Sequence, residues 1–258
     1  RDSSVTGVQT CALPICLAGH LLPPAETLEV SRLATFGASL REFSTTELMR
    51  MWNLYSTQSM FALARSLGIE PATLEGVCGR HGIPLREEII YPWQDARVQA
   101  LFADAEFQSI VTGHCAADRA LLLGYLAQRG LSAGVTRVGI VDIGWRGTIQ
   151  DNLAHLLPGH TLYGHYLGLA RVLNEQPANC RKYAFGPDLN KQVEASHLLD
   201  AVAPLEMLSN SPHGSTEGYR RNAEGRVEAR RLVDQDENAV HEQYVSHFQA
   251  GVLHAAQA

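Results

Sequence analysis

Apolar side chains recur at three- and four-residue intervals through much of the first half of the chain, which is the spacing of amphipathic helices. Ser, Thr or Pro residues precede several of these segments and Gly residues follow them, as at helix ends. We predict a helical subdomain or insertion over residues 45–130, and a shorter helix over 32–40 after a short strand at 28–30. The helices expected in the subdomain cover 45–55, 57–67, 72–81, 93–104 and 107–129.

A nearly continuous apolar run at 138–143 is typical of a strand that is buried on both faces of a parallel sheet. A glycine-rich turn and a helical pattern over 148–157 follow it, and a second strand is expected over 161–170. The segment 138–170 therefore predicts a β-α-β crossover, which makes α/β with a parallel-sheet core the expected fold class.

The C-terminal part alternates between helical and extended patterns. We expect a helix over 198–208, a loop over 209–216, a hairpin over 218–233 and a terminal helix over 238–258. The residues Asn222-Ala223-Glu224-Gly225 have the composition of the hairpin's turn.

The first fifteen residues are expected not to be native protein sequence. Residues 5–15, Val-Thr-Gly-Val-Gln-Thr-Cys-Ala-Leu-Pro-Ile, resemble the translation of a short-read sequencing adapter, and Arg1-Asp2 fit the stretch before it. We therefore exclude residues 1–16 from fold reasoning, and expect an N-terminal part of the protein to be missing. Residues 17–258 are then expected to form one incomplete α/β domain, with 45–130 as its helical insertion and 218–258 as its hairpin plus helix.

Composition narrows the class of protein. The chain has 258 residues, 45% of them hydrophobic, and can bury a core. Its net charge of −6, with basic residues spread along the sequence, provides no footprint for nucleic acid, and no apolar run approaches the roughly 20 residues that span a bilayer. The cysteines beyond residue 16 have no zinc-site spacing and favour a reducing compartment. We expect a cytoplasmic protein whose partners are small molecules or proteins.

The most informative segment joins the strand at 138–143 to the helix after it. Ligands of α/β proteins bind at such strand ends. We expect the two glycines to let backbone N–H groups converge on an anion, the helix N-terminus to add partial positive charge, and Arg146 to bind phosphate. Asp142 would hold a ribose or sugar hydroxyl or a metal, for which Mg²⁺ is a candidate. The candidate ligand-binding residues here are Asp142, Gly144, Trp145, Arg146, Gly147, Thr148 and Gln150.

A structural interpretation of the same segment stays open. Asp142 would then cap the helix, the glycines would form a tight turn and Trp145 would pack under a neighbouring loop. We favour the ligand interpretation because an arginine and an acid beside two turn glycines are more than a connection requires.

Two further segments are secondary candidates for the same pocket. Ser31 and Arg32 follow the first predicted strand, and a surface turn is an equal alternative for them. The loop 211–219, with Glu206 upstream, contains His213 and Ser215. Its composition indicates a turn first and a ligand contact second, because nucleophilic catalysis by a His–Ser pair needs a geometry that spacing does not give.

Known phosphate-binding templates do not match the segment. It contains neither a G-x-x-x-x-G-K-[ST] loop nor the G-x-G-x-x-G of dinucleotide folds. It looks somewhat like the ribose-phosphate loop of phosphoribosyltransferases, except that Ile143 stands where their second acid would be.

Several motifs, taken in order, resemble the C-terminal region of bacterial proteins that carry a haloacid-dehalogenase-like (HAD) hydrolase domain and occur with surface-polysaccharide biosynthesis. The motifs are Val-Ser-Arg at 30–32, Val-Asp-Ile-Gly-Trp-Arg-Gly-Thr-Ile-Gln at 141–150, Tyr-Gly-His-Tyr-Leu-Gly-Leu at 163–169 and Leu-Glu-Met-Leu-Ser-Asn-Ser-Pro-His-Gly-Ser-Thr-Glu-Gly-Tyr at 205–219. Hydrolysis in that family depends on an Asp-x-Asp pair, whereas Asp142 is followed by Ile143 and Gly144. The resemblance implies a companion domain whose hydrolase partner preceded it.

The sequence is compatible with three functions. The first is a domain that binds a phosphorylated small molecule or nucleotide sugar in such a hydrolase-linked protein. The second is a phosphoribosyltransferase-like or sugar-phosphate transferase, which would depend on Asp142. The third is a non-catalytic module that docks a protein partner through the helices of 45–129.

Overall fold

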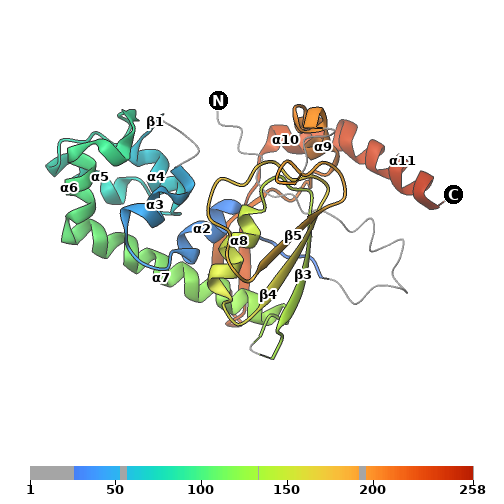
Figure 1. The fold of residues 1–258 in the computed structure, drawn as a ribbon, viewed down its shortest axis with the longest axis horizontal. Helices are drawn as coiled ribbons and strands as arrows, with labels where there is room; N and C mark the ends of the chain where they lie inside the picture. Colours follow the sequence, from blue (N-terminus) through green and yellow to red (C-terminus); the bar gives the residue numbers. More distant parts are fainter. Residues whose placement is uncertain (1–25, 53–56, 133, 192–195, 258) are drawn as a thin grey trace.

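The computed structural model describes residues 26–52, 57–132, 134–191 and 196–257, and every structural statement below refers to these residues (Figure 1). The expectation that residues 1–16 are non-native and pack poorly lies outside the described residues. So does the expected start of native sequence near Leu17.

Three parallel strands form the central sheet, in the order β3-β4-β5. Strand β3 (Arg137–Asp142) is followed by helix α8 (Thr148–Leu156) and strand β4 (Thr161–Tyr166), which pairs with β3 in parallel. This arrangement confirms the predicted β-α-β crossover and the α/β class. Strand β5 (Cys180–Ala184), which the sequence did not indicate, pairs in parallel with β4.

The described residues cover the sheet on one face only. Val138, Leu162 and Cys180 point to the covered face and are buried. On the opposite face Val141 and Tyr183 expose 48% and 44% of their surface. The expectation of a strand buried on both faces is therefore wrong for β3, because no described helix packs on its second face.

The helical region over 45–130 lies beside the sheet (Figure 1). The helices at 45 and 72 begin at the predicted residues, those at 60 and 96 begin three residues later than predicted, and the one at 105 begins two residues earlier. Polar side chains cap several of them: Ser59 accepts a hydrogen bond from the Ala62 N–H, and Asp104 accepts from the N–H groups of Glu106 and Phe107. The elements of this region are α3 (Thr45–Trp52), β1 (Thr57–Gln58), α4 (Met60–Ser66), α5 (Ala72–Arg80), β2 (Ile89–Ile90), η1 (Pro92–Gln94), α6 (Ala96–Ala103) and α7 (Ala105–Gln128).

Two expectations about this part of the chain need correction. Residues 28–30 do not form a strand, because the chain there runs between α7 and the C-terminal hairpin, where the Glu29 N–H donates to the Tyr125 hydroxyl and the Glu29 carbonyl accepts from Tyr219. Residues 57–58 do not begin a helix, since they pair with 89–90 in a short antiparallel ladder.

Two hydrophobic cores are present, and two helices contribute to both. One core fills the helical region, and the other lies between the sheet, α8 and the C-terminal hairpin. Helix α2 (Arg32–Ser39) buries Phe36 in the first core and Ala38 in the second. Helix α7 likewise buries Phe107 in the first and Leu126 in the second.

The C-terminal part contains the predicted hairpin and terminal helix with shifted ends. The single helix expected over 198–208 is wrong, because the non-helical residues 200–202 separate a short 3-10 helix at Ser196–Leu199 from an α-helix at Ala203–Leu208. The hairpin begins at Ser215, three residues before the expected start, and the terminal helix begins at Gln235 and contains a π-helical turn. No helix within the described ranges is long and apolar enough to cross a membrane. The elements here are η2 (Ser196–Leu199), α9 (Ala203–Leu208), β6 (Ser215–Arg221), β7 (Val227–Leu232), α10 (Gln235–Val240), η3 (His241–Val245) and α11 (Ser246–Gln257).

Candidate functional site

The turn between β3 and α8 requires glycine at two positions. Gly144 has φ +135° and Gly147 has φ +67°, which are conformations that other residues rarely adopt. A Cβ atom at 144 would collide with the carbonyl oxygen of Gly168, and one at 147 would lie 2.7 Å from the hydroxyl oxygen of Tyr166. The glycines therefore let the turn pack directly against neighbouring strands and loops.

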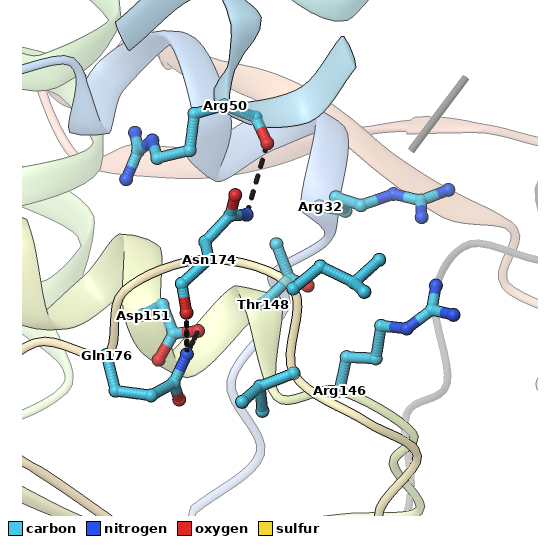
Figure 2. Close-up of a pocket in the computed structure, with 9 residues that line it drawn as sticks. Arg32, Arg50, Arg146, Thr148, Asp151, Asn174 and Gln176 are labelled. Atoms are coloured by element: carbon cyan, nitrogen blue, oxygen red, sulfur yellow. Dashed lines mark hydrogen bonds between the residues drawn. The ribbon is translucent and has the colours of Figure 1, made fainter. Parts of the chain in front are cut away.

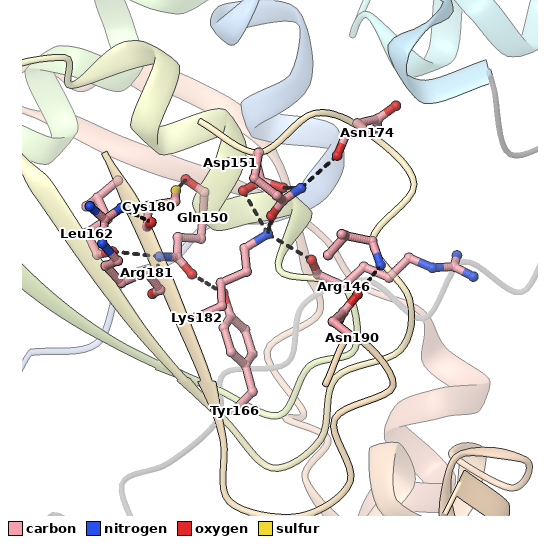
Figure 3. Close-up of polar contacts among 12 residues, drawn as sticks. Arg146, Gln150, Asp151, Leu162, Tyr166, Asn174, Cys180, Arg181, Lys182 and Asn190 are labelled. Carbon is pink, nitrogen blue, oxygen red and sulfur yellow. Dashed lines mark hydrogen bonds and ion pairs between the residues drawn. The ribbon is translucent and has the colours of Figure 1, made fainter. Parts of the chain in front are cut away.

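Lys182 on β5 contacts both this turn and α8 (Figure 3). Its ammonium group lies 2.7 Å from Oδ1 of Asp151 and donates to the carbonyl oxygen of Arg146 at 3.0 Å and to Oε1 of Gln176 at 2.6 Å. Burial raises the pKa of the Asp151 carboxyl group, and the ammonium group of Lys182 opposes that shift. The pair thus fixes α8, β5 and the loop at residues 171–179 around the turn.

An outer hollow opens beside the first turn of α8. Thr148 begins this helix, and the N-cap residue Gly147 has no side chain to accept hydrogen bonds from its first N–H groups. In Figure 2 the guanidinium groups of Arg32 and Arg146 extend in the same direction past Thr148. We call this the outer hollow, lined by Arg32, Arg50, Arg146, Thr148, Asp151, Val172, Leu173, Asn174 and Gln176.

A second, inner hollow continues from the outer one. The two share four lining residues, so they form one groove between α2, α3, α8 and the loop at 171–179. The inner hollow is lined by Phe36, Arg50, Thr148, Asp151, Asn152, His155, Asn174 and Glu175.

Arg50 on α3 is the most constrained cation of the groove. Its side chain is 14% exposed and its guanidinium carbon lies 5.5 Å from the ring centre of Phe36. Nη2 donates to the Ser39 hydroxyl at 2.7 Å, whereas the buried Nε and Nη1 atoms have no hydrogen-bond partner among the described residues. Burial lowers the pKa of this guanidinium group, with the carboxylate of Glu47 opposing the shift.

His155 lies in the inner hollow near Arg50. Burial, and after it the guanidinium groups of Arg50 and Arg41, lower the pKa of His155 to about 4. The imidazole is therefore neutral at pH 7 and presents one N–H donor and one acceptor.

The structure brings part of the predicted site together. Arg146 and Thr148 line the outer hollow, and Arg32, a secondary candidate from a distant segment, lines it with them. Ser31 does not, because its side chain is fully buried, caps α2 and donates to the carbonyl oxygen of Thr216 at 2.5 Å.

The other five candidates from the turn line neither hollow: Asp142, Gly144, Trp145, Gly147 and Gln150. Asp142 is the last residue of β3. Burial of the neighbouring Tyr166 raises the pKa of its hydroxyl group, and the Asp142 carboxylate raises it further. Trp145 donates from Nε1 to Glu206 at 2.9 Å and so ties the turn to α9. Gln150 is buried and donates to carbonyl oxygens on β4 and β5, at Leu162 and Arg181.

The loop before β6 does not contribute to the groove. His213 is exposed within a turn that ends at Gly214, which has φ +72°, and Ser215 begins β6 opposite Leu232. The turn interpretation of this loop agrees with the structure.

Sequence reasoning missed several residues that line or support the groove. Arg50 resembles any cation in the last turn of an amphipathic helix, and Lys182 lies on a strand that was not expected. Asn174 and Gln176 belong to a polar loop without a motif. Their convergence depends on tertiary packing, so local pattern carries no signal for it.

Comparisons with protein-family models and with curated proteins found no match to this chain. Within the described ranges, no group of three or more His, Cys, Asp or Glu side chains is placed to hold a metal ion. The expectation that Asp142 holds a metal ion, with Mg²⁺ as a candidate, stays a prediction.

Proposed function

We propose that this protein binds a phosphorylated small molecule, with the phosphate group in the outer hollow. The observation that carries this proposal is that Arg32 and Arg146, from separate elements, line one hollow with Thr148 at the uncapped N-terminus of α8, with their guanidinium groups extending in the same direction (Figure 2). The chain as a whole is acidic, so this local concentration of positive charge is a specific feature of the groove.

Three physical effects favour a phosphate at this position. The first N–H groups of α8 carry the positive end of the helix dipole. Guanidinium groups form bidentate, charge-assisted hydrogen bonds with phosphate oxygens. The Thr148 side chain adds a hydroxyl at the start of the helix, and Lys182 fixes the turn from which Arg146 projects.

The alternatives receive less support from the geometry. A transferase that depends on Asp142 would need this residue in the groove, and it does not line either hollow. A docking module would need exposed apolar side chains on the helices of 45–129. The large exposed ones described in that range are Ile90 and Tyr91, which lie on β2 and the turn after it.

A nucleotide sugar remains within the proposed ligand class because its diphosphate presents the same oxygens. The resemblance to the companion region of HAD-linked polysaccharide proteins, and with it a hydrolase partner, also stays a prediction.

Calorimetric titration with inorganic phosphate, phosphoribosyl pyrophosphate and a uridine diphosphate sugar tests the proposal. We expect Arg146→Ala and Arg32→Ala each to weaken binding of the tightest of these ligands about tenfold, the loss of one charge-assisted contact. Arg137→Ala is the matched control, because Arg137 is exposed on the open sheet face and stacks on Tyr163. Unchanged affinity in both groove variants, or absence of binding to all three ligands, contradicts the proposal.

A further inference from the structure

We infer that the inner hollow is a second anion subsite, so that the ligand carries a carboxylate or second phosphate in addition to its first phosphate group. This inference rests on the proposed function for the first group. Its own basis is the unused hydrogen-bonding capacity of Arg50.

Arg50 keeps two buried N–H-bearing atoms, Nε and Nη1, without a partner among the described residues. Leaving such donors unpaired in a protein interior is costly, and more so for a charged group. The carboxylate of Glu47 does not satisfy them, since it lies 3.8 Å from Nη2 of Arg50 and makes its closer hydrogen bonds to Arg41. An anionic oxygen in the inner hollow would accept hydrogen bonds from these two atoms of the guanidinium group.

The other groups around the inner hollow also suit an anion. His155 is neutral at pH 7 and has no hydrogen bond to a described residue, so its N–H is available. Asp151 is neutralised by its ion pair with Lys182, which removes the nearest source of repulsion. Glu175 is exposed, so solvent screens its charge.

The positions of the arginines argue for two separate anion sites. In Figure 2 the guanidinium group of Arg50 lies on the opposite side of Asn174 and Thr148 from those of Arg32 and Arg146. The guanidinium group of Arg50 therefore faces a different part of the groove from those of Arg32 and Arg146. The two hollows share Arg50, Thr148, Asp151 and Asn174, so one ligand can extend through both.

The ligand class that follows is a small phosphorylated acid or a bisphosphate, and two pairs of probes distinguish these sources. Glycerol 3-phosphate ends in a hydroxymethyl group where 3-phosphoglycerate has a carboxylate. Fructose 6-phosphate and fructose 1,6-bisphosphate differ in a second phosphate. In each pair the first compound occupies only the outer hollow.

Competition calorimetry on the full chain tests the inference. We expect the member with the second anionic group in at least one pair to bind about tenfold more tightly than its partner, and Arg50→Gln to abolish that preference. Arg65→Gln, an exposed arginine on α4, serves as control and should keep the preference. Circular dichroism verifies that Arg50→Gln is folded.

A second measurement does not depend on that variant. A crystal structure of the unaltered chain with the preferred ligand should place its second anionic group within hydrogen-bond distance of Nε or Nη1 of Arg50. Equal affinity within both pairs, with inorganic phosphate still bound through Arg146, overturns the second subsite and leaves the proposed function intact. Failure of every phosphorylated probe to bind overturns the proposed function itself.

Discussion

The ammonium group of Lys182 and the backbone carbonyl oxygen of Arg146 lie 3.0 Å apart, so strand β5 directly positions the turn that precedes α8. The same ammonium group neutralises Asp151 in the first turns of that helix. One side chain therefore connects the sheet to the groove.

Lys182→Met should destabilise the fold and weaken phosphate binding together. The substitution leaves the carboxylate of Asp151 buried without its partner, which costs on the order of 3 kcal/mol of unfolding free energy. Urea denaturation measures this loss. The double variant Lys182→Met/Asp151→Leu should recover much of the stability, whereas its phosphate affinity should stay low because Arg146 has lost its anchor. Full stability in the single variant would show that the pair is not structurally important.

Gly144→Ala should destabilise the protein by roughly 3 kcal/mol, because a Cβ there meets the Gly168 carbonyl in a backbone conformation that alanine rarely adopts. Gly139→Ala, on β3 of the same sheet, is the matched control. A Cβ at Gly139 has no atom within 4 Å, and we expect a change within about 1 kcal/mol. Thermal unfolding of both variants distinguishes the two positions, and equal melting temperatures would contradict the close approach at Gly144.

Gln150→Leu separates a structural role from a ligand role for the buried amide. Its side chain bridges carbonyl oxygens of β4 and β5 and accepts from the Tyr166 hydroxyl at 2.6 Å. Without this amide, the two carbonyl oxygens and the Tyr166 hydroxyl lose a hydrogen-bond partner. This should lower the free energy of unfolding by about 2–4 kcal/mol, against about 1 kcal/mol for Tyr166→Phe. Phosphate affinity of the folded variant, measured by calorimetry, should stay close to that of the parent. A large loss of affinity at full stability would instead assign Gln150 to the ligand.

His155 predicts a dependence of stability on pH. Its pKa in the folded protein is about 4, below the ordinary value of 6.5, so the unfolded chain binds the extra proton more readily. The favourable contribution of the neutral imidazole is present above pH 6.5 and is lost as the pH falls toward 4. Between these values, the unfolding free energy of the parent should decrease more steeply than that of His155→Leu, as chemical denaturation at several pH values would show. Parallel curves would contradict the lowered pKa.

The local patterns of the sequence predicted the crossover well, because each of its parts has its own signal. The apolar run before Asp142, the two glycines and the amphipathic pattern of α8 are all short-range features. The helices of 45–130 were identified for the same reason. The sequence does not predict strand β5, because Cys-Arg-Lys-Tyr-Ala contains no apolar run. One side of this strand faces the open face of the sheet.

The candidate site was predictable only where one segment supplies it. Arg146 and Thr148 follow from the turn, and Arg32 was identified as a separate candidate. Arg50 was not, because nothing within α3 shows that its guanidinium group packs over Phe36 and approaches α8. The strand predicted at 28–30 is absent, because hydrogen bonds from Glu29 to Tyr125 and from Tyr219 to Glu29 take the place of a strand ladder.

Helix α7 has 24 residues and no interruption between its contacts with one core and its contacts with the other. At about 1.5 Å per residue it extends for roughly 36 Å. The helical region therefore cannot be excised without loss of the second core, because the boundary between the two cores falls within α7, between Cys115 and Leu122. A ligand bound in the groove between α3 and α8 would contact both the helical region and the sheet region, and α7 contributes to the cores of both. Binding should therefore protect the amide hydrogens of α7 from exchange along its whole length.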